Sequence, residues 1–151
     1  MLLFPARGRG GSDLTLSYRF LSGRRGIAYT VSGRLTRTEF NSAYTSVLLP
    51  SFAGAPLFYV FFEFGDDVSQ VEIPTDELRA MAAVVTKTSR HKSFRRVTAI
   101  YAKNDEPFAR SREWRGFVAQ IAEVEVFRER LEALNWLRKR VAEKFNIPIE
   151  H

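Results

Sequence analysis

Two apolar runs of this chain each end in side chains that are suited to acid–base chemistry or to cation binding. The run FYVFFEFGDD carries three carboxylates: Glu63, Asp66 and Asp67. The run RVTAIYA is followed by three polar residues: Lys103, Asn104 and Asp105. A carboxylate pair that faces a lysine can transfer protons, and carboxylate oxygens bind hard cations. The same residue types also turn an ordinary strand into a loop.

The rest of the composition favours the structural interpretation. The chain has no cysteine and only two histidines, so thiolate zinc sites and cysteine nucleophiles are excluded, and a multi-histidine metal site is not expected. No glycine-rich phosphate-binding motif accompanies the carboxylates. We therefore expect no catalytic residue, no metal and no cofactor. Two orientations stay open for Glu63. Its side chain either faces the interior, where it must be paired or protonated, or is exposed to solvent at the end of the strand.

The elements that hold these residues follow from periodicity. LTLSYRF and IAYTVSG alternate around the turn SGRRG, which predicts an antiparallel hairpin. PLFYVFFEF is apolar on both faces, which indicates a central strand covered on both sides. RVTAIYA and VEVF are predicted as further strands, and the segment GDDVSQVEIP is interpreted as a polar loop.

Four helices are expected between or after these strands. Thr36 and Glu39 have the spacing of a capping box, and Pro50 and Gly54 close the helix that follows. Thr75 is predicted as the N-cap of the second helix. Residues 107–122 and about 130–145 carry apolar stripes at helical spacing and are predicted as the third and fourth helices.

These elements predict an α/β fold in the order β-β-α-β-α-β-α-β-α. We expect a mixed, mostly parallel five-stranded sheet with about four helices packed over it. A length of 151 residues favours one domain. Residues 1–13 are predicted as a flexible arm and residues 14–147 as the domain.

The C-terminal stretch VEVFRERLEALNWL combines a strand that ends in Phe127 with Ala133 and the pair Trp136-Leu137. This pattern resembles the closing motif of the SpoIIAA-like family, also described as STAS/SEC14-like domains. FRRVTAIYAKND is similar to the fourth strand of that family, and the element order agrees from about Leu14 to Phe145. The four motif residues are also expected to fill the core, which accounts for them without any chemistry.

The resemblance implies a fold shared with bacterial anti-sigma-factor antagonists and with the STAS domains of anion transporters. Such antagonists carry a phosphorylatable Ser or Thr within an Asp-Ser-Ser-Gly-like run after the central strand. This chain lacks that run, and Ser69 and Thr75 are the nearby hydroxyls. The resemblance thus implies a non-enzymatic regulatory or protein-interaction module.

Ligands of mostly parallel sheets bind beyond the carboxyl ends of the strands. We name this predicted working surface the crest. It consists of Gly33, the loop from Gly65 to Thr75 and residues 103–105, and Glu63 lies next to it. The candidate partner-binding residues are Gly33, Glu63, Gly65, Asp66, Asp67, Ser69, Thr75, Lys103, Asn104 and Asp105.

A net charge of +6 raises the alternative of an anionic partner. The densest basic patch consists of Arg90, Lys92, Arg95 and Arg96. It could contact phosphates, but a solvated helix end explains it equally, so nucleic acid is not the expected partner.

Thirteen phenylalanines leave a second alternative open, a carrier of a small apolar, lipid-like or acidic ligand held in an internal cavity. The same aromatic surface could instead form a homodimer. No apolar run is long enough to span a bilayer, and the N-terminal sequence does not resemble a signal peptide. A cytoplasmic location is therefore the expectation.

Overall fold

The computed structural model of the protein describes residues 16–43, 57–89 and 94–149. The predicted N-terminal arm lies outside these ranges. So do Leu14, Pro50 and Gly54, and with the last two the predicted end of the first helix.

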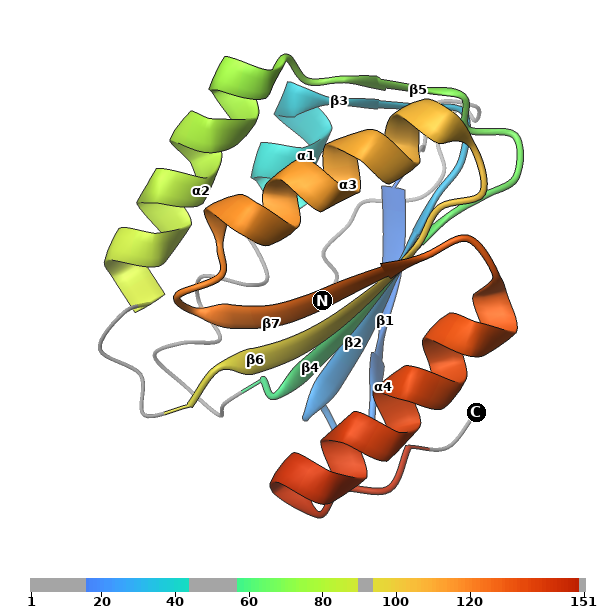
Figure 1. Cartoon of the computed structure of the whole chain (residues 1–151), viewed down its shortest axis with the longest axis vertical. Helices are drawn as coiled ribbons and strands as arrows, with labels where there is room; N and C mark the ends of the chain where they lie inside the picture. Colours follow the sequence, from blue (N-terminus) through green and yellow to red (C-terminus); the bar gives the residue numbers. More distant parts are fainter. Residues whose placement is uncertain (1–15, 44–56, 90–93, 150–151) are drawn as a thin grey trace.

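A five-stranded sheet in the order β1-β2-β4-β6-β7 forms the centre of the described structure (Figure 1). Its strands are β1 (Leu16–Leu21), β2 (Gly26–Val31), β4 (Tyr59–Phe64), β6 (Arg96–Tyr101) and β7 (Ala122–Phe127). β1 pairs with β2 antiparallel, and the other neighbours are parallel. The predicted α/β fold with a mixed, mostly parallel sheet is confirmed.

Four helices cover the two faces of the sheet unequally (Figure 1). They are α1 (Arg37–Ala43), α2 (Thr75–Ser89), α3 (Asp105–Phe117) and α4 (Arg130–Phe145). The first three lie on one face, and α4 is the one described helix on the other, where it contacts β4, β6 and β7. The predicted capping box is present at α1, since Glu39 N donates to Thr36 Oγ1 at 3.3 Å and Thr36 N donates to Glu39 Oε1 at 3.3 Å. Asn146 ends α4 with a left-handed backbone conformation and donates from its N–H to Ala142 O.

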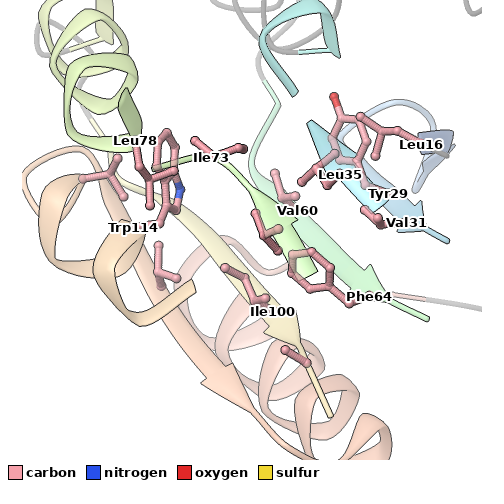
Figure 2. Close-up of a cluster of buried hydrophobic side chains, with 14 of the residues drawn as sticks. Leu16, Tyr29, Val31, Leu35, Val60, Phe64, Ile73, Leu78, Ile100 and Trp114 are labelled. Carbon is pink, nitrogen blue, oxygen red and sulfur yellow. The ribbon is translucent and has the colours of Figure 1, made fainter. Parts of the chain in front are cut away.

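Each face of the sheet has its own apolar cluster. Figure 2 shows part of the cluster under α1–α3, where Val60, Phe64 and Ile100 from the sheet lie with Leu78 and Trp114 from the helices. The cluster under α4 has the following buried members: Ala28, Tyr59, Phe61, Val97, Ala99, Tyr101, Ala133, Leu134, Leu137, Val141 and Ile147. Successive residues of β4 belong to opposite clusters, as expected of a strand covered on both sides.

The hairpin between β1 and β2 brings the chain unusually close to a buried ring. Gly26 pairs with Leu21 across the hairpin and with Tyr59 in the parallel register. The ring of Tyr59 lies against Gly26 with no room for a side chain there, and its hydroxyl contacts Ser22 Oγ. This glycine is required by a close approach, because an aromatic side chain of the neighbouring strand occupies its Cβ position.

The predicted element order is incomplete. The predicted polar loop contains β5 (Gln70–Glu72), which pairs in parallel with β3 (Arg34–Thr36) to form a separate two-stranded sheet. Leu35 and Val71 anchor the two short strands in the core under α1–α3.

The predicted helix over residues 107–122 is also wrong at both ends. α3 begins two residues earlier, because Asn104 takes the extended backbone of an N-cap. It ends at Phe117, where Val118 leaves the helical conformation and a turn follows, with Ile121 N donating to Val118 O. β7 consequently begins at Ala122, two residues before the predicted strand.

Candidate functional site at the crest

The crest assembles at the carboxyl ends of β2, β4 and β6. Gly65 N donates to Val31 O at 2.7 Å, which fixes the exit of β4 beside the exit of β2. Gly33, whose φ is 74°, donates from its N–H to Asp67 Oδ2 at 3.1 Å. A left-handed backbone suits glycine, and it aims this N–H across the crest. The structure therefore brings together the predicted residues Gly33, Gly65 and Asp67.

The exit of β6 is tied to the same loop. Asn104 Nδ2 donates to Asp66 O at 3.0 Å and to Val68 O at 2.6 Å, and its backbone forms the N-cap of α3. One side chain thus joins the start of a helix to the loop after the central strand. Because the Val68 carbonyl belongs to a fully buried residue, this hydrogen bond fixes the loop more firmly than a solvated one would.

Tyr101 is an unpredicted member of the crest. Its hydroxyl donates to Asp66 Oδ1 at 2.7 Å, and the residue is 8% exposed. The hydrogen bond to Asp66, assisted by burial and by the negative charges of Asp66 and Glu63, raises the pKa of Tyr101 to about 12. Tyr101 therefore stays protonated, as a donor to the carboxylate, throughout the physiological pH range.

The raised pKa predicts how stability depends on alkaline pH. An unfolded tyrosine titrates near 10.0, so the contribution of the Tyr101–Asp66 bond is complete below pH 10 and is lost as the pH rises towards 12. Tyr101→Phe should lower the free energy of unfolding by about 1 kcal/mol near neutral pH, and this deficit should shrink above pH 10. Urea denaturation at several pH values measures the deficit.

Tyrosinate absorbance provides an independent check. Tyr101 should ionise near pH 12 in the native protein, and Tyr101→Phe should reduce the amplitude of the late transition by one of the five tyrosines. An unchanged amplitude in the variant, or a stability deficit that does not change with pH, would contradict the assignment.

Two arginines complete the crest and were not predicted. Arg128 donates from Nη1 to Lys103 O at 3.0 Å and to Asp105 Oδ1 at 2.9 Å. Arg130 donates from Nε to Glu63 Oε2 at 2.6 Å. Both lie directly after β7, whose carboxyl end meets the same edge of the sheet. The sequence did contain a signal for these two arginines, because they follow the predicted strand VEVF and the ends of parallel strands meet.

The orientation of Glu63 is now determined. Its side chain is 20% exposed and paired with Arg130, on the face that α4 covers. Phe61, two residues earlier in β4, lies on the same face, with the Arg130 guanidinium 5.7 Å from its ring centroid. Glu63 is therefore a paired carboxylate at the sheet edge.

The two predicted hydroxyls at the crest differ in their surroundings. Ser69 is exposed. Thr75 is the first residue of α2, because the carbonyl of the preceding Pro74 accepts from Leu78 N at 2.9 Å, so the predicted N-cap role is wrong. Its Oγ1 donates to Glu113 Oε1 at 3.1 Å and accepts from Arg110 Nη1 at 3.3 Å, which links α2 to α3.

Half of the predicted basic patch falls within the described residues, and this half, Arg95 and Arg96, lies at the opposite end of the sheet. Arg95 is exposed, and its Nη2 donates to Ala119 O at 2.9 Å and to Ala122 O at 3.2 Å. Arg96 is 7% exposed and donates from Nε to Leu57 O, so its side chain does not belong to an exposed patch. Arg90 and Lys92 lie outside the described ranges.

The carboxylates of the crest, and Glu63 next to it, all have donors from the protein: Asp66 from Tyr101, Asp67 from Gly33, Glu72 from Arg34, Asp105 from Arg128 and Glu63 from Arg130. Within residues 16–43, 57–89 and 94–149, no three histidine or acidic side chains gather in a way that could hold a metal ion. The helices described there include none with the length and apolar character needed to cross a membrane. The geometry is that of a fixed polar surface.

Comparisons with known proteins add no further assignment. No family model matches the chain, and a search of curated proteins finds no similar sequence.

Proposed function

We propose that this protein is a non-enzymatic regulatory or protein-interaction module that binds another protein through its crest. The observation that carries the proposal is the fixation of the Asp66–Asp67 loop by three donors from two strand exits of the crest. Gly33 N holds the loop from the exit of β2, and the Tyr101 hydroxyl and Asn104 Nδ2 hold it from the exit of β6. A surface that is ordered before binding loses less conformational entropy on association, which favours recognition of a partner.

The donors of the crest also favour binding over catalysis. A general base needs a lone pair directed at a substrate, and a general acid needs a proton that it can release near neutral pH. The pairing of the crest carboxylates with arginines, a tyrosine and a backbone amide reduces their value for proton transfer. The pKa of Tyr101, about 12, likewise makes it a poor acid at neutral pH.

The charge of the crest indicates the chemistry of the partner. Its carboxylates are Asp66, Asp67, Glu72 and Asp105. Its cations are Lys103 and Arg128, and the pair that Glu63 forms with Arg130 beside it is neutral. Glu72 is paired with Arg34, and the Asp105 side chain is 95% exposed even though Arg128 contacts it. A partner with a basic patch is therefore favoured, in contrast to the positive net charge of the whole chain.

Membership of the SpoIIAA-like family is part of this proposal. The opening antiparallel hairpin, the parallel strands that follow it and the closing helix support the resemblance. Ala133 and Leu137 of the closing motif are buried as expected. Phe127 and Trp136 are half-buried and pack on each other, with ring centroids 5.8 Å apart.

The test compares two variants that each remove two negative charges. Asp67→Asn with Asp105→Asn keeps an amide oxygen for Gly33 N and for Arg128 but removes two of the negative charges of the crest. Glu125→Gln with Glu143→Gln removes two carboxylates that also pair with arginines, away from the crest. A partner that co-purifies with the wild-type protein should bind the crest variant at least about tenfold more weakly and the control variant unchanged.

Equal affinity of the two variants for that partner would contradict a binding role for the crest. Native mass spectrometry of gently purified protein tests the carrier alternative separately. A small molecule that is released only on denaturation would favour the carrier over the interaction module.

A further inference from the structure

The end of the sheet opposite the crest carries three mutually packed aromatic rings. We name this surface the base; it consists of Phe58, Phe94, Phe145, Arg25, Arg95 and Lys144. The Phe58 ring lies 4.9 Å from the Phe94 ring and 4.9 Å from the Phe145 ring, centroid to centroid, and Phe94 and Phe145 are 5.6 Å apart. All three residues are half-buried, so the rings are held in place while part of each stays accessible.

Three cationic residues flank the rings of the base, and one of them, Lys144, contacts a ring. Phe58 N donates to Arg25 O at 2.8 Å, and Arg95 follows Phe94 directly in the chain. Lys144 Nζ lies 5.4 Å from the Phe145 centroid and donates to Arg95 O at 2.8 Å. Lys144 Nζ is also paired with Glu123 Oε1 at 3.5 Å, and the other oxygen of Glu123 accepts from Arg140 Nε at 2.5 Å. The arginines keep donors beyond those that bond to backbone carbonyls.

We propose that the base binds single-stranded nucleic acid, with bases stacked on the phenylalanine rings and phosphates held by Arg25, Arg95 and Lys144. Proteins that bind single strands combine a cationic track for the backbone with aromatic platforms for the bases. The base supplies both, within a cluster whose rings already fix one another. This second interaction is independent of the crest, which lies at the other ends of the same strands.

The exposure of apolar side chains favours a nucleic acid strand over an anionic membrane. Peripheral membrane binding buries protruding apolar side chains below the headgroups. Among the described residues, the large apolar side chains that are clearly exposed are Val84 and Leu131, and neither belongs to the base. The half-buried rings of the base do not protrude, so they offer little to insert into a bilayer.

The experiment measures binding of a fluorescently labelled oligothymidylate of about ten nucleotides, within the usual site sizes of single-strand binding proteins. Binding should be detectable at about 50 mM salt, and log K should fall against log salt with a slope of about −2, since each of three phosphate contacts contributes about 0.7. Arg25→Gln should weaken binding several-fold and reduce the slope by about 0.7. Arg112→Gln on α3 is the matched control and should leave both unchanged.

Phe94→Leu tests the stacking contribution. It keeps an apolar side chain at the position and should lower affinity about fivefold or more without changing the salt slope. Thermal unfolding of the same sample shows whether Phe94→Leu is folded. If this variant does not fold, Arg25→Gln still tests the proposal, because it changes an exposed side chain.

Three results would overturn the proposal. They are no binding of the oligonucleotide at about 50 mM salt, equal affinities of Arg25→Gln and Arg112→Gln, or binding to phosphatidylserine vesicles without binding to the oligonucleotide.

Discussion

Gly26→Ala is expected to destabilise the protein by about 3 kcal/mol, a large effect for the addition of one methyl group. A Cβ at this position would lie 2.5 Å from Cε2 of Tyr59 and still closer to Cζ and Cε1. The ring cannot yield easily, because Tyr59 is fully buried and its hydroxyl contacts Ser22. Accommodation therefore requires β2 and β4 to move apart. Urea denaturation followed by circular dichroism measures the change.

Gly116→Ala provides the matched control. Gly116 lies in α3, and a Cβ added there would meet nothing within 4 Å. Alanine should stabilise the helix by about 0.5–1 kcal/mol, because glycine loses more backbone entropy on folding. The same substitution thus has opposite signs at two positions. If both variants were destabilised equally, the contact with Tyr59 would not be the cause.

Leu137→Ala should cost about 2–5 kcal/mol, comparable to or larger than the effect at Gly26. Leu137 is 1% exposed and lies in the cluster that α4 forms with β4 and β6. Because α4 is the single helix on this face among the residues that the structure describes, no other described helix can close over the resulting cavity. Thermal and chemical denaturation should both show the loss, and the near-ultraviolet spectrum of the surrounding aromatic residues should change with it.

Leu131→Ala is the control within the same helix. Leu131 is 65% exposed, so its truncation should change stability by less than about 0.5 kcal/mol. A large effect at Leu131 would indicate that a partner or another copy of the chain covers it in solution. A small effect at Leu137 would mean that α4 is only loosely attached to the sheet.

Periodicity was sufficient to predict the main sheet and most of the helices. Leu16, Tyr18 and Phe20 alternate as expected in β1, and Leu78, Ala82 and Val85 form the buried stripe of α2. Those signals extend over six residues or more. β3 and β5 have three residues each, too few to show a period, and their pairing joins segments far apart in the chain. That contact was not predictable from local sequence.

The crest was predicted in outline and missed in its contacts. Strand exits that carry Asp67 and Asn104 meet at one edge because the strands are parallel, and this follows from topology alone. Which donor each carboxylate contacts depends on the direction of the side chains. Alternation along a strand predicts that direction only when the register between the strands is known. The sequence therefore predicted Tyr101 only as a residue of a strand, with no part in the crest. In the structure Tyr101 is the register partner of Glu63 and lies on the same face of the sheet.

The position of α4 has a consequence for synthesis of the protein on the ribosome. The strands of the main sheet are complete at Phe127, and both the helix that covers one of their faces and the Pro148 carbonyl that accepts a hydrogen bond from Ser22 follow them in the chain. The ribosome adds about 5–20 residues per second and releases the N-terminal side first. The apolar face with Phe61 and Val97 therefore stays uncovered by α4 until this helix has also emerged, and a nascent chain stalled before α4 exposes that face.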